Sequence, residues 1–391
     1  MINVVHLLPH LDSQTGGMER QALQVATALS KKNCNVVFVT CADWTRMKRD
    51  RLRSIDQFGG IPIYRIPTIR GWRLTNAFLF LFGGIVSLIT LRRRYTIVHA
   101  HQIHTSGIIT GVLKSLLPSK SAIVKNPGGG AFGDLQEMEK FWGHSILKGF
   151  LLRMIDVFVG VSEETVNEMA DAGFQRVKLI PNGVNTKLFV PVSAEEKLEI
   201  RRAILGPVAH DYVAVFVGRL GPEKNLLVLL DAIAEIELDV FLLVVGEGAQ
   251  REEVQRYVRT KKIQQRVAFW GTVNDVHRFY QMADVFVLPS LSEGLPNTLL
   301  EAMSCGIPSV GSNINSIRSV IDHKHNGYLF KNDESQDLAE AMTKILTDPH
   351  LARFLSVNAR KIVEERFSLD HVAHEYVRLY ESLDKASLDR M

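Results

Sequence analysis

Short apolar runs alternate with amphipathic segments along the whole chain. The runs are rich in β-branched and aromatic residues, which predicts buried parallel strands covered by helices. In the first half we expect strands at Asn3–Leu8, Asn35–Thr40, Ile61–Ile66, Ile97–His101, Ser121–Lys125, Val157–Val161 and Val177–Ile180. In the second half we expect strands at Val213–Val217, Val240–Val245, Val267–Trp270, Val285–Leu288, Ser309–Gly311 and Gly327–Leu329. This alternation predicts an α/β fold of doubly wound parallel sheets.

The boundary between the two series lies near residues 181–197. Pro181-Asn182-Gly183-Val184 has the Asn-Gly chemistry of a turn, and the polar stretch Pro191–Lys197 follows it. We interpret this segment as an interdomain linker. A chain of 391 residues also exceeds what one compact core usually holds. We therefore predict a domain over residues 1–188, a similar-sized domain over residues 189–368 and a helix-rich terminal segment over residues 369–391.

Composition and charge exclude some classes of function. Hydrophobic residues make up 46% and charged residues 23% of the chain, as in an ordinary folded globular protein. The formal net charge of +4 is too weak for a general nucleic-acid binder. Cys34, Cys41 and Cys305 lack metal or disulfide spacing, which favours a reducing cytoplasm. Residues 1–12 lack the basic start and long apolar core of a secretory signal and instead predict a buried strand.

The stretch Pro289–Val310 contains two carboxylates eight residues apart. A loop over Ser292–Pro296 carries Glu293, and a helix that starts near Asn297 carries Glu301 in its second turn. A helix N-terminus after a parallel strand favours an anionic ligand at the carboxyl edge of the sheet. Because carboxylates repel a phosphate, these two would face hydroxyl groups instead. A nucleotide sugar has both phosphates and hydroxyl groups. The alternative is a pair of solvated surface glutamates.

Basic and glycine-containing loops follow other strands of the second half. Arg219 ends one strand and Lys224 begins the next helix, so both cations can bend over one phosphate site. Gly246 ends the following strand and would let backbone approach a nucleotide, whose base Val273 would line. Taken alone, each of these features is more often a turn or solvated surface.

Two loops of the first half are candidates for substrate binding. Gly17 lies in the loop Ser13–Met18, where glycines let backbone N–H groups approach a ligand closely. After the strand Ser121–Lys125 come three consecutive glycines that can offer N–H groups to an anion. Asp134 follows them, and its carboxylate could orient an acceptor hydroxyl or take its proton. The alternative for Asp134 is a helix N-cap or turn residue.

Three histidines lie close together in the sequence. His99 and His101 alternate on one side of a strand end, and His104 follows in a loop. No carboxylate or cysteine accompanies them at ligand spacing, so a metal site is disfavoured. His101, at the carboxyl end of its strand, could meet substrate; the alternative is a hydrogen-bonded structural histidine.

The segment Arg70–Tyr95 has the most unusual composition of the chain. An uncharged run, Leu74–Leu91, lies between Arg70 and Arg73 before it and the three arginines 92–94 after it. One interpretation is an interfacial helix whose arginines meet anionic head groups. The other is an ordinary helix that packs on the sheet. A spanning helix is disfavoured, because the apolar part is marginal in length and two glycines interrupt it.

Several motifs together resemble the retaining GT-B glycosyltransferases grouped as family 4. The Glu293-to-Glu301 element is one, and the others keep the family's order over nearly the full chain: Gly16–Leu29, Val159–Met169, Ile180–Phe189, Val215–Ile233, Leu242–Gly248 and Val267–Val273. The resemblance implies two Rossmann-like domains facing each other across a cleft, with a C-terminal helix that crosses back to the first domain. It also implies an acceptor-binding first domain and a second domain that binds the nucleotide sugar.

The resemblance implies roles for individual residues. Glu301 would hold the ribose hydroxyls and Glu293 the donated sugar, while Gly294, Leu295 and Asn297 would contact sugar and phosphate. Gly17 would lie beside the donor diphosphate. The implied reaction is metal-independent transfer of a sugar from a UDP- or GDP-sugar to an acceptor hydroxyl with retention, and no cofactor or dedicated nucleophile is expected.

The chain departs from the family pattern in one loop. Many members place a histidine there that touches the donor, where this chain has Lys125-Asn126-Pro127. Candidate catalytic residues are then Glu293, Arg219 and Lys224, together with Asp134 as a base and His101 as a residue that meets substrate. Expected partners are a nucleotide sugar, a glycan or lipid-linked acceptor of cell-envelope polysaccharide, lipopolysaccharide or glycolipid synthesis, and an anionic membrane surface through Arg70–Arg94, but no nucleic acid. We expect a cytoplasmic protein, peripheral to the membrane if that surface is used. Alternatives are a non-catalytic nucleotide-sugar-binding subunit, an epimerase or a phosphorylase of the same fold.

Overall fold

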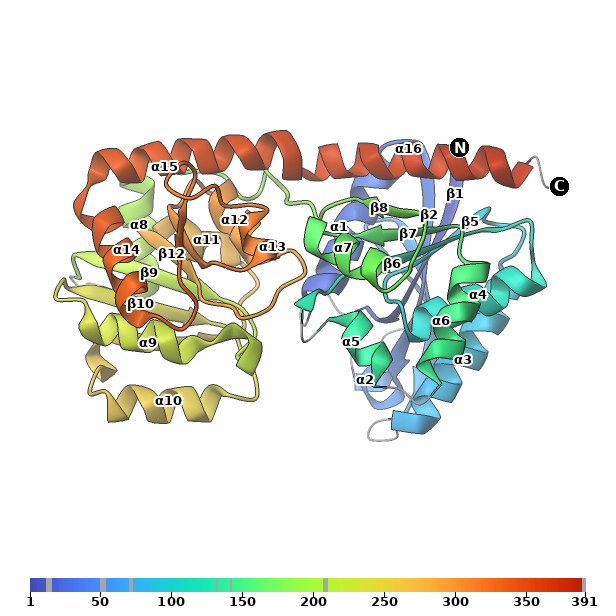
Figure 1. Cartoon of the computed structure of the whole chain (residues 1–391), viewed down its shortest axis with the longest axis horizontal. Coiled ribbons are helices and arrows are strands. Elements are labelled where there is room, and N and C mark those ends of the chain that lie inside the picture. Colours follow the sequence, from blue (N-terminus) through green and yellow to red (C-terminus); the bar gives the residue numbers. More distant parts are fainter. Residues whose placement is uncertain are drawn as a thin grey trace. The chain divides into compact units, whose positions relative to one another are not determined.

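The computed structural model describes residues 1–11, 16–49, 54–69, 73–130, 133–140, 143–206 and 210–388. These residues form two compact units, each built of helices around its own sheet (Figure 1). Unit 1 comprises Met1–Gly183 with Leu369–Met391, and unit 2 comprises Val184–Ser368. The predicted α/β class with doubly wound sheets is confirmed.

The sheet of unit 1 has the strand order β3-β4-β2-β1-β5-β6-β7-β8, parallel except for the β3–β4 pair. Its strands are β1 (Ile2–His10), β2 (Cys34–Asp43), β3 (Ile55–Phe58), β4 (Ile61–Thr68), β5 (Ile97–Ala100), β6 (Ser121–Asn126), β7 (Val157–Gly160) and β8 (Val177–Leu179). Its helices are α1 (Gly17–Ser30), α2 (Trp44–Arg49), α3 (Arg73–Thr90), α4 (Thr105–Leu116), α5 (Asp134–Glu139), α6 (His144–Met154), α7 (Glu163–Asp171) and α16 (Leu369–Leu388). Since β1 lies between β2 and β5, the strand order reverses at β1.

The sheet of unit 2 is parallel, with the order β11-β10-β9-β12-β13-β14. Its strands are β9 (Tyr212–Val217), β10 (Val240–Val245), β11 (Val267–Gly271), β12 (Val285–Leu288), β13 (Ser309–Ser312) and β14 (Tyr328–Phe330). Its helices are α8 (Ala194–Leu205), α9 (Leu226–Glu235), α10 (Arg251–Thr260), α11 (Val276–Met282), α12 (Asn297–Ser304), α13 (Asn315–Arg318), α14 (Ser335–Thr347) and α15 (Pro349–Ile362), with short 3₁₀ turns η2 (Pro222–Lys224) and η3 (Gln264–Arg266) and a π-helical turn η4 (Val363–Phe367). The strand order reverses at β9, which lies between β10 and β12.

Each predicted strand is present, but the sequence patterns missed β3 and α8. Residues 194–197 of the predicted linker stretch Pro191–Lys197 instead form the first turn of α8. Ser193 caps this helix by accepting a hydrogen bond from the N–H of Glu196. Lys197 and Arg201, one helical turn apart, both bind the carboxylate of Asp284 at 2.6 and 2.8 Å. This ion-pair cluster fixes a mainly polar helix to the sheet, which explains why apolar periodicity did not reveal it.

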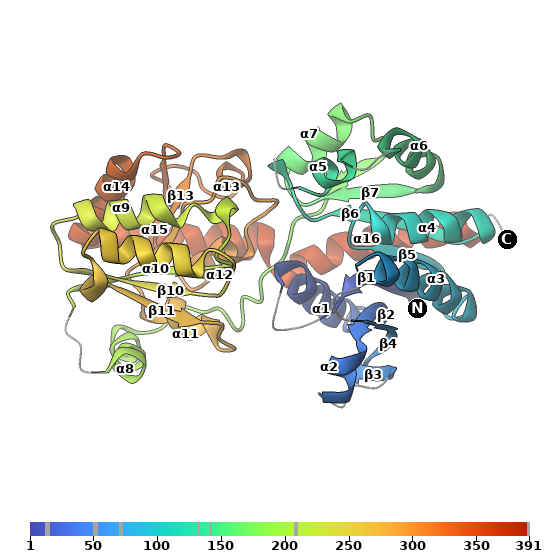
Figure 2. The same ribbon diagram turned by 90° about the horizontal axis from the view of Figure 1, so that it is seen from below.

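Helix α16 packs beside α1 on one face of the unit 1 sheet, and α3 and α4 lie side by side on the other (Figure 2). Buried side chains of α16 complete the core that β1 and α1 begin; they are Val372, Ala373, Tyr376, Leu379, Tyr380 and Leu383. Each large apolar side chain contributes roughly 1.5–3 kcal/mol when fully buried. The C-terminal helix is therefore an integral part of unit 1, as the fold prediction required.

The chain passes from unit 1 to unit 2 after Gly183, earlier than the predicted boundary at residue 188. The buried Gln21 amide of α1 bonds both backbone groups of Gly183, accepting from its N–H at 3.1 Å and donating to its carbonyl. The following residues belong to unit 2 instead, because the Arg360 guanidinium donates to the carbonyls of Thr186 and Phe189 at 2.9 and 2.6 Å. These hydrogen bonds divide the linker between the two units.

Candidate active site

Arg219, Lys224 and Glu293 of unit 2 lie on the connections that leave β9 and β12 at their carboxyl ends, and Glu301 lies on the helix that follows β12. These strands are neighbours at the point where the strand order reverses. Ligands of doubly wound sheets bind at such a point, because the helices that follow the two strands lie on opposite faces and leave a crevice between the loops. The topology therefore places both loops where a ligand site is expected.

Arg219 and Glu223 form a hydrogen-bonded pair in the loop after β9. The Arg219 Nε and Nη2 atoms donate to Glu223 Oε1 at 3.1 and 2.8 Å. Burial would raise the pKa of Glu223, but hydrogen bonds, mainly from Arg219, outweigh this effect and lower it. Glu223 is only 9% exposed, whereas the Arg219 side chain is 75% exposed. A buried carboxylate thus fixes one side of an exposed guanidinium whose remaining donors can reach a phosphate.

Lys224 and Glu293, which are far apart in the sequence, form a direct ion pair. Lys224 Nζ lies 2.5 Å from Glu293 Oε1, and the Ser290 hydroxyl donates to the same oxygen at 2.7 Å. The backbone N–H of Leu291 donates to the Glu223 carbonyl at 2.9 Å, which ties the β12 loop to the β9 loop. The structure therefore brings the predicted cation and carboxylate into one group.

Glu301 lies on α12, as predicted, and it is buried, unlike the solvated surface residue of the alternative interpretation. It is 4% exposed, and the Tyr280 hydroxyl of α11 donates to its Oε2 at 2.9 Å. Pro296, the N-cap of α12, offers no side-chain acceptor to the first N–H groups of the helix. The positive end of the helix dipole therefore remains directed at the sheet edge, where it favours an anion.

Gly246 lets two loops of this edge meet closely. Its φ is +136°, and a Cβ there would lie 1.9 Å from the Gly218 carbonyl oxygen. A Cβ at Gly248 would lie 2.2 Å from the Leu220 carbonyl oxygen. The glycines are therefore required for contact between the β9 and β10 loops. Val273, in the loop that connects β11 to α11, is half-buried at the same edge of the sheet.

In unit 1, Gly17 is the first residue of α1, and its neighbour Gly16 is the extended N-cap. β1 lies at the point of strand reversal in its sheet, so the N-terminus of α1 occupies the position where an anion would bind. Residues 13–15 of the predicted binding loop lie outside the described residues.

Asp134 is the first residue of α5, and the N-cap is Gly133 instead. Asp134 Oδ2 accepts a hydrogen bond from the Ile103 N–H at 3.2 Å, and Oδ1 lies 3.8 Å from His104 Nε2. The carboxylate is mostly buried beside a half-buried histidine. In the preceding loop, the Gly130 N–H donates to Glu168 Oε1 at 2.7 Å, so this N–H is already used by the protein.

His101 lies in a buried cluster with His99 and with His6, which the sequence analysis did not select. His101 Nε2 and His6 Nδ1 share a hydrogen bond of 2.9 Å. The Tyr380 hydroxyl of α16 lies 2.7 Å from His99 Nδ1 and 3.3 Å from His6 Nε2. Burial lowers the pKa of all three imidazoles, that of His6 to about 3.

The ligand atoms of these three histidines lie within 4.8 Å of one another, a spacing that a metal ion could bridge. The buried ammonium of Lys125 acts on all three imidazoles and would repel a bound cation. We therefore interpret the cluster as a structural hydrogen-bond network. At 3% exposure, His101 has little access to substrate, and its catalytic role stays a prediction.

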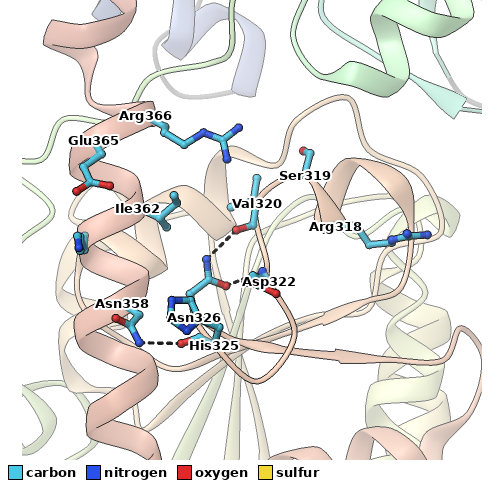
Figure 3. Close-up of a pocket in the computed structure, with 11 residues that line it drawn as sticks. Arg318, Ser319, Val320, Asp322, His325, Asn326, Asn358, Ile362, Glu365 and Arg366 are labelled. Carbon is cyan, nitrogen blue, oxygen red and sulfur yellow. Dashed lines mark hydrogen bonds between the residues drawn. The ribbon is translucent and has the colours of Figure 1, made fainter.

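A separate groove of about 390 Å³ lies in unit 2 (Figure 3). Its walls come from the region between α13 and β14 and from α15 with η4. Arg318, Lys361 and Arg366 line it together with the carboxylates of Asp322 and Glu365. None of the predicted donor-binding residues is among its lining residues. The mixed, exposed charges have the character of a solvated surface.

Four partners of the predicted residues were not found from the sequence. They are Glu223, Ser290, Tyr280 and His6. Glu223 and Ser290 lie inside the motifs that were recognised, so an acidic or hydroxyl residue beside a functional cation or carboxylate was an available signal. His6 lies in an apolar run that predicts only core, and Tyr280 lies in the mixed polar and apolar segment Val276–Met282, where no local pattern marks its partner.

Two family models match the chain, each over one of its halves. Glycosyltransferase Family 4 matches residues 15–188, and Glycosyl transferases group 1 matches residues 199–362. Among curated proteins, an Escherichia coli UDP-Gal:alpha-D-GlcNAc-diphosphoundecaprenol alpha-1,3-galactosyltransferase is 29% identical over 303 residues, which cover 73% of this chain and 76% of that protein.

Solved structures resemble the whole chain. The Anabaena protein Alr3699/HepE, solved in complex with UDP and glucose, superposes with a TM-score of 0.80 at 19% identity and covers 98% of this chain and 100% of its own. A sucrose-phosphate synthase from Thermosynechococcus elongatus superposes with a TM-score of 0.83 at 21% identity and covers 99% and 100%. At these identities the likeness shows the shared two-sheet fold.

Proposed function

We propose that the donor of this protein is a UDP-sugar and that unit 2 binds it. The proposal starts from the family, because the chain belongs to the group 1 glycosyltransferases of family 4. These are retaining enzymes of GT-B fold that use nucleotide sugars. The observation that carries the proposal is the Lys224–Glu293 pair at the strand reversal of unit 2. The UDP complex of the Anabaena protein and the UDP-Gal donor in the name of the Escherichia coli relative favour UDP over GDP.

Each side chain of the site has a role in this proposal. Lys224 and the exposed donors of Arg219 neutralise the diphosphate and the charge that grows on it as the sugar leaves. Glu293 accepts hydrogen bonds from the sugar, and Glu301 accepts them from the ribose. The backbone of Gly294 and Leu295 and the start of α12 at Asn297 contact sugar and phosphate. Catalysis then depends on positioning and charge stabilisation.

Other site residues complete this assignment. Gly246 lets the nucleotide approach the backbone, and Val273 lines its base. In unit 1, Gly17 at the start of α1 is a candidate anion-binding position. Asp134, paired with His104, is the candidate for orienting the acceptor hydroxyl. The acceptor itself is a glycan or a lipid-linked glycan, by analogy with the diphosphoundecaprenol-linked acceptor in the name of the Escherichia coli relative.

The donor assignment predicts a ligand-dependent rise in thermal stability. A panel of UDP-, GDP- and ADP-sugars, each compared with its bare nucleotide, is tested on wild type and Glu293→Ala. We expect a UDP-sugar to raise the melting temperature beyond UDP alone, because a ligand at 100 times its Kd adds about 2.7 kcal/mol to the folded state. Glu293→Ala should remove only the difference between UDP-sugar and UDP. Glu340→Ala, on an exposed helix face, is the control.

Other outcomes of the panel would contradict the proposal in distinct ways. A complete absence of nucleotide-induced shifts at saturation would exclude the donor site. Stabilisation by UDP-sugar without transfer to any glycan acceptor and without hydrolysis would favour the non-catalytic subunit. Conversion of the bound sugar to its epimer would favour the epimerase.

We also propose that α3 contacts an anionic membrane surface. One face of the helix exposes Phe78 by 71% and Phe82 by 74%, with Val86 also exposed one turn further on. The opposite face buries Phe80 and Leu88 in the core. The three arginines 92–94 after the helix are all exposed. Exposed aromatic rings next to a basic cluster suit the interface between acyl chains and anionic head groups.

The two glycines inside α3 have a packing role that the sequence analysis did not anticipate. A Cβ at Gly83 would lie 2.7 Å from Ile66 Cγ2, and one at Gly84 would lie 3.1 Å from Ile109 Cδ1. They therefore let the buried face of α3 approach β4 and α4.

Among the described residues, no helix is long and apolar enough to span a membrane. Arg70 lies outside the described residues.

The membrane proposal predicts that Phe78→Ser with Phe82→Ser weakens vesicle binding by about tenfold or more, because burying each ring contributes roughly 1.5–3 kcal/mol. Sedimentation with vesicles of phosphatidylglycerol and phosphatidylcholine at low salt measures it. Added salt should weaken wild-type binding as well. The matched control is Phe354→Ser, at an exposed phenylalanine of unit 2. Equal binding to neutral and anionic vesicles, or none to either, would refute the contact.

A further inference from the structure

A completely buried serine contacts the carboxylate that the proposed function assigns to the donated sugar. Ser290 lies in the loop after β12, and its hydroxyl donates to Glu293 Oε1 at 2.7 Å. Lys224 Nζ lies 2.5 Å from the same oxygen. Within the part of the chain that the structure describes, both hydrogen-bond donors to the Glu293 carboxylate bind Oε1 and none binds Oε2. The protein therefore holds one end of the carboxylate, and a ligand can use the other.

Hydrogen bonds fix the backbone that carries the Ser290 hydroxyl. The Ser312 hydroxyl of β13 donates to the Ser290 carbonyl, and Ser312 is completely buried as well. The next residue, Leu291, donates its N–H to the Glu223 carbonyl in the β9 loop at 2.9 Å. β13 and β9 are the two neighbours of β12 in the sheet. The sheet of unit 2 therefore determines where the Ser290 hydroxyl lies.

The two donors to Glu293 differ in what they can fix. The Lys224 ammonium is a point charge with three equivalent donors on a flexible four-carbon stem, so it holds the carboxylate close but defines its rotation weakly. A serine hydroxyl has one proton to donate and a single side-chain torsion, so its direction follows from the backbone. The O···O distance of 2.7 Å is in the range of strong hydrogen bonds to an ionised acceptor. The rotation of the Glu293 carboxylate therefore depends on Ser290 as well as on Lys224.

We propose that Ser290 is a positioning residue for the donated sugar, which holds Oε1 of Glu293 so that Oε2 accepts hydrogen bonds from sugar hydroxyls. The inference rests on the proposed function, since it requires a UDP-sugar in unit 2. The competing interpretation is that the bond only satisfies two polar groups that would be costly to bury unpaired. The two interpretations differ in whether loss of the Ser290 hydroxyl changes sugar binding through Glu293.

The test is a double-mutant cycle measured by isothermal titration of the full chain. The ligands are UDP, UDP-galactose, UDP-glucose and UDP-N-acetylglucosamine, and the quantity compared is the Kd of UDP divided by the Kd of the tightest UDP-sugar. Ser290→Ala should lower this ratio by about tenfold, as expected for loss of a hydrogen bond to a charged group, and leave the Kd of UDP unchanged. In the Glu293→Ala background the same substitution should leave the ratio unchanged, because the residue through which Ser290 acts is gone.

Matched variants separate positioning from general stability. Ser309→Ala removes another completely buried hydroxyl of the same sheet, one that donates to the Ile307 carbonyl at 3.1 Å, and should leave both Kd values unchanged. Ser290→Cys nearly keeps the side-chain volume but has a weak donor, so it should lower the ratio nearly as much as Ser290→Ala. If Ser290→Ala does not fold, Ser312→Ala keeps the Ser290 hydroxyl but releases its backbone, and a decrease of about threefold is expected there.

The outcomes distinguish failure of this inference from failure of the proposed function. If Glu293→Ala lowers the ratio but Ser290→Ala does not, Ser290 has only a structural role, and the inference is overturned while the donor assignment stands. An equal effect of Ser290→Ala in both backgrounds would show that it does not act through Glu293, which also overturns the inference. If wild type binds neither UDP nor a UDP-sugar, the donor assignment fails and the inference fails with it. An unchanged ratio in Glu293→Ala would overturn the assignment of Glu293 to the sugar.

Discussion

Lys224→Ala is expected to lower kcat/KM for sugar transfer by about 10²- to 10³-fold, the cost typical of removing one preorganised charge or donor from a transition-state site. The loss has two sources. The diphosphate loses its ammonium partner as negative charge develops on it, and Glu293, now without its cation at 2.5 Å, loses the contact that orients it toward the sugar. Steady-state kinetics with the donor identified by the thermal-shift panel measures the change.

The ion pair makes a second variant informative. If Lys224 and Glu293 act as one unit, the double variant Lys224→Ala/Glu293→Ala should be little worse than the poorer single variant, since coupled residues are strongly non-additive. Lys331→Ala is the control, because Lys331 pairs with Glu334 at 3.5 Å on an exposed loop and should retain wild-type activity. Near-normal activity of Lys224→Ala would remove the main support for the donor site.

Acidification is expected to destabilise unit 1 steeply below about pH 6.5, the ordinary pKa of histidine. His6, His99 and His101 are neutral in the folded core, because burial lowers their pKa values, that of His6 to about 3. In the unfolded chain they regain ordinary values and bind protons that the folded state does not. The stability present above pH 6.5 is therefore lost as pH falls toward the folded pKa values, by about 1.4 kcal/mol per pH unit for each histidine.

Neighbouring groups do not reverse this sign. Lys125 faces the cluster from β6, and burial lowers its pKa to about 8, so it stays protonated in both states below pH 6.5. Tyr376 and Tyr380 face the cluster from α16, and burial raises their pKa values further above the range tested. The three histidines together then give a slope of about 4 kcal/mol per pH unit.

Urea unfolding followed by pulse proteolysis between pH 7 and pH 5, with fragments of residues 1–183 detected by mass spectrometry, measures this slope for unit 1 separately. His101→Asn should remove the contribution of about one proton, which lowers the slope of stability against pH to about 3 kcal/mol per pH unit. His350→Gln, at an exposed position of unit 2, should not change it. A stability of unit 1 that does not depend on pH in this range would contradict the buried neutral network.

The sequence predicted the strands, the two-sheet class and the main charged residues because each depends on local patterns. Apolar runs mark buried strands wherever they pair, and Arg219, Lys224, Glu293 and Glu301 lie next to predicted strand ends and helix starts. The partners of these residues depend instead on which strands become neighbours. Lys224 meets Glu293 only because β12 inserts beside β9, and no local pattern specifies that order.

Buried polar contacts were the least predictable part of the candidate site. His6 lies in an apolar run and Tyr280 in a short mixed helix, so neither sequence context marks a polar contact. Their hydrogen bonds appear only once distant segments are packed. Conversely, Gly83 and Gly84 suggested an interruption of an apolar helix, whereas they are contact points for β4 and α4. A composition pattern does not indicate which face of a helix such residues occupy.

Two separate segments of the chain form unit 1, and this has a consequence for its biosynthesis. α16 is translated only after the whole of unit 2, although its side chains complete the core around β1 and α1. At about 5–20 residues per second, the ribosome needs on the order of ten seconds or more to reach it after Gly183. During that interval unit 2 can fold as a continuous segment, while the nascent first unit exposes the apolar surface that Val372, Tyr376 and Leu379 later cover. We therefore expect chaperones to bind the N-terminal half of this chain during translation.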